Sequence, residues 1–225
     1  DVTVIMGTGW TDQNLAREAN NYILECSQHY PGRLVGFCSV NPKWGKDALK
    51  EMERCAQLGA KGVGELHPST QQFDIADIDT MKPLMNASND LDLVVLTHSS
   101  EPVGHSYPGK GNTTPDKLWA FAQNFPDNTI ICAHWGGGLP FYTLMPEIET
   151  SMRNVYFDTA ASSLLYKSTI FDAAANLIGV NKILFGSDYP ILSQRRLLDQ
   201  IERSHLSSHA KERILGRNAK DLLHI

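Results

Sequence analysis

Apolar positions along the chain follow two alternating patterns. Seven short runs are apolar at almost every position and contain many β-branched residues, which predicts buried strands of a parallel sheet. The predicted strands cover residues 2–6, 34–40, 62–66, 93–97, 129–133, 155–158 and 182–185. Between them, apolar residues recur every three or four positions, as in amphipathic helices. The predicted helices cover residues 11–30, 47–58, 77–89, 115–125, 139–151, 163–178 and the segment from 193 to the C-terminus.

The regular alternation of strand and helix predicts right-handed crossovers in either a doubly wound sheet or a barrel. No Gly-x-Gly-x-x-Gly turn follows the first strand, which argues against a dinucleotide-binding fold. Seven units in this order favour an α/β fold of the TIM type, a (β/α)8 barrel without one of its β/α units. We expect residues 1–225 to form this one barrel domain.

Polar residues stand where several of the predicted strands end. Glu65 ends the third strand, with His67 just beyond it, while His98 and His134 follow the next two strands and Asp188 follows the last. In a barrel the carboxyl ends of all strands meet on one face, where active sites form. Each residue also has a structural interpretation: Glu65 can line a wall, and Asp188 can cap the turn that follows its strand. Asp158 also ends a strand, and we expect it to cap the next segment.

The residue types at these ends suit metal chemistry. Imidazoles and carboxylates bind divalent metals such as Zn²⁺, and two histidines with two carboxylates can hold one or two ions with an open position for water. Metal-bound water ionises near neutral pH, and a neighbouring carboxylate can accept its proton. Three glycines, Gly136–Gly138, follow His134 and let the backbone approach a ligand closely.

Two further segments offer candidate substrate contacts. The predicted loop over residues 98–113 carries His105, Tyr107 and Lys110, and long loops of this kind often carry function. Trp135 can form a pocket wall beside His134. The structural alternatives are a loop that only covers the barrel mouth and a tryptophan that packs in the core.

Composition narrows the class of protein. The chain is 42% hydrophobic with a formal net charge of −5 and no basic block, which argues against nucleic-acid binding, and no apolar run approaches the roughly 20 residues of a membrane span. The four cysteines, Cys26, Cys38, Cys55 and Cys132, form no Cys-x-x-Cys pair. Free, mostly buried thiols fit a reducing cytoplasm, where we expect the protein to act on a small molecule.

Four motifs in this order resemble the amidohydrolase-related (amidohydrolase 2) family. The segment 61–68, Lys-Gly-Val-Gly-Glu-Leu-His-Pro, is similar to the family's fourth strand, and Leu96-Thr97-His98 is similar to its fifth. The segments 132–137, Cys-Ala-His-Trp-Gly-Gly, and 185–190, Phe-Gly-Ser-Asp-Tyr-Pro, resemble the sixth and eighth strands, and residues 216–223 resemble the closing helix. The resemblance covers essentially the whole chain.

The resemblance implies roles for four residues. It makes His98 a metal ligand, Asp188 a metal ligand and proton shuttle, and His134 either a ligand of a second metal or a group that activates water or polarises substrate. Glu65 stands where some members have a metal-bridging carboxylate, and the implied cofactor is a divalent metal, with Zn²⁺ the expected ion. The family's first strand ends in a His-x-His that supplies two ligands. This sequence has no His-x-His, so we expect the natural protein to carry one more strand, and a homo-oligomer across the gap is compatible with the sequence.

The expected activity is hydrolysis of an amide, ester or lactone by a metal-activated water, with Asp188 and His134 as catalytic residues. Two alternatives stay open. The same family contains metal-dependent, non-oxidative decarboxylases, which differ from hydrolases in releasing carbon dioxide. A non-catalytic barrel that only binds ligands would explain the absence of His-x-His, although His98, His134 and Asp188 together argue against it.

Overall fold

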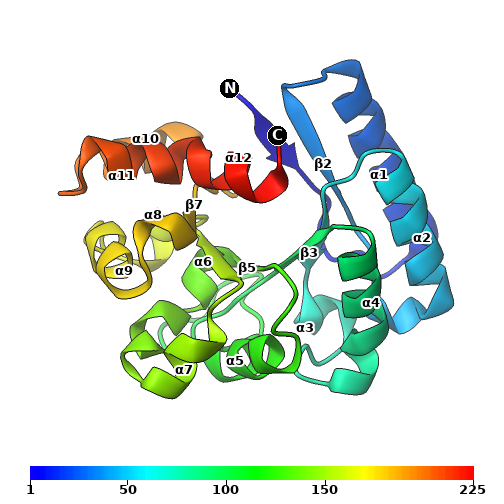
Figure 1. Ribbon diagram of the computed structural model, residues 1–225, viewed down its shortest axis with the longest axis horizontal. Coiled ribbons are helices and arrows are strands. Elements are labelled where there is room, and N and C mark those ends of the chain that lie inside the picture. The colour runs from blue at the N-terminus through cyan, green and yellow to red at the C-terminus, as the bar shows by residue number, and fades with distance from the viewer.

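A sheet of seven parallel strands forms the centre of the structure, a computed structural model that describes residues 1–225. The strands are β1 (Thr3–Ile5), β2 (Leu34–Cys38), β3 (Gly62–Leu66), β4 (Val94–Thr97), β5 (Ile130–Cys132), β6 (Val155–Asp158) and β7 (Ile183–Leu184). Each strand pairs in parallel with the next along the chain. The sheet curls so that β1 and β7 are its two free ends (Figure 1). The predicted barrel of seven β/α units is confirmed.

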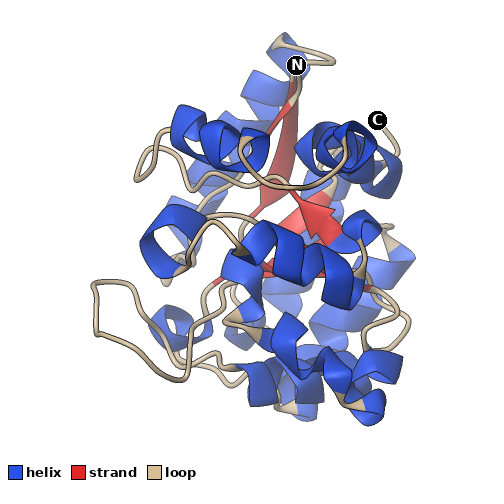
Figure 2. Cartoon of the chain, turned by 90° about the vertical axis from the view of Figure 1, so that its left-hand side faces the viewer, coloured by secondary structure: helices blue, strands red, loops and turns tan.

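Helices surround the strands on the outside, as Figure 2 shows in blue around red. The longer ones, which follow β1–β4, β6 and β7, are α1 (Gln13–His29), α2 (Lys46–Gln57), α4 (Ile78–Asp90), α5 (Pro115–Asn124), α9 (Ile170–Ile178) and α10 (Gln194–Glu202). The shorter ones are α3 (Pro68–Gln71), α6 (Ala133–Gly136), α7 (Pro146–Ser151), α8 (Ser162–Leu165), α11 (Ser208–Glu212) and α12 (Asn218–Leu223). Four tight turns complete the list: 3₁₀ turns η1 (Pro42–Trp44), η2 (Leu139–Leu144) and η3 (Val180–Lys182), and the π-helical turn η4 (Arg213–Arg217). None of these helices combines the length and apolar character needed to cross a membrane.

Two predicted helices are each divided in the structure. The segment 139–151 forms η2 and α7, because Met145 precedes Pro146 and is extended (ψ 117°). A proline disfavours helical geometry in the residue before it, and it then starts the next helix at its first turn. The segment 163–178 forms α8 and α9, separated at the extended Tyr166 (ψ 157°). The division places Tyr166 in the loops at the carboxyl ends of the strands.

The sheet has an apolar cluster on each face. Alternate strand residues face the helices and belong to a core of 33 buried residues, among them Val95, Ile130 and Phe157. The other strand residues, such as Phe37 and Leu96, face the inside of the curled sheet in a second cluster of eight buried residues. Leu223 of α12 joins this inner cluster, and Figure 1 shows the red C-terminal helix between β7 and the first two strands.

Candidate metal centre

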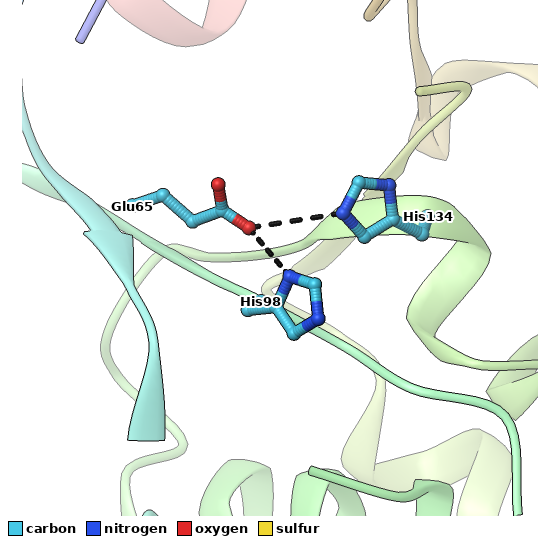
Figure 3. Close-up of side chains that lie close together, drawn as sticks. All are labelled: Glu65, His98 and His134. Carbon is cyan, nitrogen blue, oxygen red and sulfur yellow. Dashed lines mark hydrogen bonds and ion pairs between the residues drawn. The ribbon is translucent and has the colours of Figure 1, made fainter. Parts of the chain in front are cut away.

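Three side chains from neighbouring strand ends meet at one point. Glu65 lies in β3, His98 directly follows β4, and His134 follows β5. The His98 Nδ1 lies 2.9 Å from Glu65 Oε1, and the His134 Nε2 lies 3.7 Å from the same oxygen. Figure 3 shows one oxygen of the Glu65 carboxylate directed toward both imidazoles. The positions that the sequence suggested at these three strand ends are thus side by side.

An irregularity in β3 accompanies the placement of Glu65. The pairing of β3 with β4 shifts register between Val63 and Leu66, and such bulges redirect side chains next to functional sites. Gly64 at this shift lies so close to β4 that a Cβ would stand 2.7 Å from the Leu96 carbonyl oxygen. A residue with a side chain at position 64 would push β3 away from β4, and Glu65 away from His98.

The electrostatics of the cluster couple the carboxylate to its two imidazoles. Burial alone raises the pKa of Glu65, but contact with His134 and His98 outweighs burial and holds the pKa well below its usual range. Burial alone lowers the pKa of His134, whereas Glu65, followed by the charges of Asp158 and Asp188, raises that pKa to about 9. The cluster therefore holds a carboxylate anion and favours a positive charge beside it.

This donor set is suited to a metal ion. One ligand atom from each of Glu65, His98 and His134 lies within 4.8 Å of the other two. The His98 Nε2 and His134 Nδ1 are buried and have no hydrogen-bond partner. A buried nitrogen without a hydrogen bond lowers the stability of the fold. In metal sites, a histidine ring commonly binds the ion through one nitrogen and fixes its orientation with a hydrogen bond from the other. One carboxylate and two imidazoles form a ligand set typical of divalent metals.

Asp188 lies at the edge of this group. It follows β7 in a left-handed conformation (φ 60°), and its carbonyl accepts hydrogen bonds from Ile191 and Leu192. Its side chain is outside the group of three that can share one ion. Its charge nevertheless contributes to the raised pKa of His134.

The loop after β4 is fixed by its own contacts. The Tyr107 hydroxyl donates to Glu101 at 2.8 Å, and the ring centroid of the exposed His105 lies 5.7 Å from that of Tyr107. The Lys110 ammonium donates to the carbonyls of Val103 and His105. Lys110, predicted to contact substrate, is therefore engaged in holding the loop together, whereas His105 remains accessible.

Trp135, predicted as a pocket wall, lies in the core instead. It has no exposed surface, its ring packs against Phe171, and its indole nitrogen donates to Ser162 at 2.7 Å. The reason is that the turn at residues 134–138 is left-handed, so that its side chains do not follow the directions of an ordinary strand-to-helix connection.

Two residues contribute more to the site than the sequence indicated. His67, a candidate at its strand end whose alternative role was to orient the loop before Pro68, stacks on His98 with ring centroids 4.1 Å apart. Asp158, considered only as a cap, accepts hydrogen bonds from the backbone of His134 as well as from Ala160. Both stand at or just past a strand end, which is the signal they share with Glu65 and His98.

Comparison with known proteins identifies relatives along the whole chain. The sequence model of the family described as Amidohydrolase matches residues 1–225. The 2-amino-3-carboxymuconate-6-semialdehyde decarboxylase of Dictyostelium discoideum is 23% identical over 93% of this chain and 66% of its own length. The 6-methylsalicylic acid decarboxylase of Penicillium expansum is 28% identical over 78% of this chain and 63% of its own length. The chain thus spans slightly less than two thirds of both relatives.

Solved structures share the fold at low sequence identity. The 5-carboxyvanillate decarboxylase from Sphingomonas paucimobilis superposes with a TM-score of 0.84 at 18% identity, over all of this chain and 79% of that one. A dihydroxybenzoic acid decarboxylase from Polaromonas sp., solved with bound manganese, superposes with a TM-score of 0.75 at 22% identity, over 97% of this chain and 78% of that one. A TIM-barrel protein from Bordetella bronchiseptica also matches, with a TM-score of 0.72 at 21% identity over 97% of this chain and 76% of that one.

These relatives correct the expected reaction. Hydrolysis of an amide, ester or lactone was the first interpretation of the sequence, and it is wrong, because the curated relatives are decarboxylases. The physical reason is that a divalent metal flanked by histidine and carboxylate polarises an oxygen of the substrate in either reaction. Residue types at strand ends therefore indicate metal chemistry without fixing which bond breaks.

Proposed function

This chain belongs to the amidohydrolase family, and on that premise we propose that it is a metal-dependent, non-oxidative decarboxylase of a small carboxylic acid. The observation that carries the proposal is the meeting of Glu65, His98 and His134 at adjacent strand ends. The names of the curated relatives support decarboxylation as the reaction.

Glu65, His98 and His134 would hold the metal, and Asp188, beyond the end of β7, would act beside them as a nearby charge. Zn²⁺ and Mn²⁺ both suit a set of carboxylate and imidazole ligands, and the Polaromonas structure supports Mn²⁺ as the first ion to try. When bound, the ion would supply positive charge that orients the oxygens of the substrate and stabilises the negative charge that develops on the substrate as carbon dioxide departs.

The protein's own groups would manage the proton. In a non-oxidative decarboxylation the bond between a carbon and its carboxylate breaks, its electron pair stays on that carbon, and carbon dioxide leaves. The same carbon takes up one proton, so the net reaction consumes a proton and needs no oxidant. Asp188 is the proposed proton carrier, because the residue is partly exposed, so that solvent can recharge its carboxyl, and because its charge acts on His134.

The loop after β4 would provide substrate contacts beyond the reacting carbon. His105 is exposed, and Tyr107 is fixed by Glu101, so both can present polar atoms to a hydroxylated or unsaturated ring. Lys110 would act indirectly by keeping this loop in shape.

The test is an assay for released carbon dioxide with the full chain. The metal-free protein is reloaded with Mn²⁺ or Zn²⁺ and incubated with 2,6-dihydroxybenzoate, 5-carboxyvanillate and 6-methylsalicylate, and with aryl esters and amides of similar size. We expect carbon dioxide from at least one acid, no cleavage of the esters and amides, and loss of turnover in Asp188→Asn. A metal-loaded protein that releases no carbon dioxide from any acid would overturn the proposal.

A further inference from the structure

The backbone that presents His134 adopts a conformation that it does not favour by itself. His134 (φ 53°) and Trp135 (φ 58°) are both left-handed, and Gly136, Gly137 and Gly138 continue with positive φ. Left-handed geometry is unfavourable for each residue with a side chain, and consecutive residues rarely adopt it. Glycine relieves this cost at three of the five positions, but not at His134 and Trp135.

The close packing of this turn leaves it little room to relax. A Cβ on Gly137 would stand 2.2 Å from the Ser100 carbonyl oxygen, so the turn lies directly against the segment that follows His98. A strained conformation of this kind persists only where surrounding contacts determine it. One such contact must act on the backbone of His134 itself.

Asp158 makes that contact. Its Oδ1 accepts hydrogen bonds from the backbone nitrogens of His134 at 2.9 Å and Ala160 at 3.0 Å. Asp158 is 8% exposed, and a hydrogen bond inside a protein is stronger than the same bond in water. The carboxylate thus joins the first residue of the left-handed turn to the end of β6.

The position of Asp158 is itself fixed from the other side. A Cβ on Gly186 would stand 3.2 Å from the Asp158 side chain, so the segment that follows β7 packs directly against it. The neighbouring Thr159 exchanges two hydrogen bonds with the backbone of Gly186, through its hydroxyl, at 2.9 and 3.0 Å. Asp158 is therefore held by contacts that do not involve the turn.

We propose that Asp158 is a positioning residue that holds the left-handed turn at His134, so that the imidazole faces Glu65 and the cluster can bind its metal. Asp158 acts through the backbone amide of His134, and the acceptor oxygen, not the negative charge, is what the turn requires. This inference deepens the proposed function, on which it rests for the role of the metal, but its test does not depend on catalysis.

The experiment compares Asp158→Ala, which removes the acceptor, with Asp158→Asn, which keeps an oxygen at the same place without the charge. In the metal-free protein we expect hydrogen exchange at the His134 amide to accelerate in Asp158→Ala and to stay slow in Asp158→Asn. Titration with Mn²⁺ should show an affinity lower by roughly tenfold or more in Asp158→Ala, and within about threefold of wild type in Asp158→Asn.

Asn128→Ala is the matched control. Asn128 is also buried and donates to Met85 and Ser88, but it precedes β5, at the opposite end of the strand that leads to His134. This variant should lose stability and keep the Mn²⁺ affinity of wild type. If Asp158→Ala does not fold, Asp158→Ser takes its place with the same expectation, because its shorter hydroxyl cannot reach both amides.

Two results would overturn the inference. One is an Asp158→Ala protein with the His134 exchange rate and Mn²⁺ affinity of wild type. The other is an Asp158→Asn protein that loses as much affinity as Asp158→Ala, which would make the charge the important feature. Neither result depends on decarboxylation, so failure of the proposed reaction with normal Mn²⁺ binding would be recognised separately.

Discussion

Two glutamates with little solvent exposure differ in the partners that surround them. Glu51 lies in α2 and Glu65 in β3, and in both the pKa is lowered although burial alone would raise it. Glu51 is satisfied by neighbours that need no further partner: Arg54 donates twice to its carboxylate, at 2.6 and 2.9 Å, and Asn20 donates at 2.9 Å. Glu65 faces two imidazoles instead.

The two carboxylates differ in whether their set of partners is complete. Arg54 lies one helical turn from Glu51 and is permanently charged, so this ion pair is complete without any ligand. The imidazoles beside Glu65 come from two other strands, and each retains a buried nitrogen without a partner. A lowered pKa is thus common to both sites, and the incomplete set of partners is our reason for proposing Glu65, and not Glu51, as part of a binding site.

The largest effect should come from neutralising each glutamate in turn. Glu65→Gln removes the anion that faces both imidazoles, and we expect decarboxylation to fall by about a thousandfold or more, or roughly 4 kcal/mol of transition-state stabilisation. Glu51→Gln should leave turnover near wild type, because its partners lie on α1 and α2. Steady-state kinetics of carbon dioxide release on both variants measures this contrast.

Equal losses of activity in the two glutamine variants would contradict this distinction. The Mn²⁺ content of the purified proteins is the accompanying measurement. It should fall in Glu65→Gln and remain unchanged in Glu51→Gln.

Removal of the metal should produce the next largest effect, on stability. A ligand that binds only the folded state stabilises it by about 2.7 kcal/mol at a concentration of 100 times its Kd. For a chain of this length that corresponds to a fall in Tm of roughly 5–10 °C when a chelator is added. Differential scanning calorimetry with and without chelator provides the measurement.

The glutamate variants sharpen this second prediction. In Glu51→Gln the chelator should lower Tm by the same amount as in wild type, whereas in Glu65→Gln it should change Tm little. A chelator that leaves the wild-type Tm unchanged would show that the cluster does not hold a metal that stabilises the fold.

The sequence predicted the strand ends better than the connections between them. The positions of Glu65, His98 and His134 followed from apolar runs that end in a polar residue, because parallel strands place those ends on one face. The type of reaction could not be predicted from these residues, because the same ligands serve hydrolases and decarboxylases. The names of the relatives corrected the expected reaction.

Backbone conformation explains what the sequence could not indicate. The burial of Trp135 and the contact of Asp158 with His134 both depend on the left-handed turn at residues 134–138. Two of those five residues are not glycine, and local preferences alone favour an ordinary right-handed helix start there. Lys110 similarly bonds to carbonyls of its own loop, a contact that depends on the folded loop and not on spacing.

The smallest effect, in the free energy of unfolding, should distinguish Glu51 by its pH dependence. Burial tends to raise the pKa of Glu51, but hydrogen bonds from Arg54 and Asn20 lower it below the usual 4.5. A lowered pKa means that the unfolded chain binds a proton at a higher pH than the folded chain does, so this stabilisation is complete above about pH 4.5 and is lost as the pH falls below it.

At pH 7, Glu51→Gln should therefore be less stable than wild type by about 1–3 kcal/mol, because Arg54 loses its charged partner. Urea unfolding at pH 7 and at successively lower pH should show the two proteins converging in acid, with the metal removed from both so that Glu65 contributes equally. If the difference in free energy of unfolding between the two proteins stays constant from pH 7 into acid, the charge of Glu51 does not stabilise the fold. Glu51 and Glu65 would then be distinguished only by how they pack.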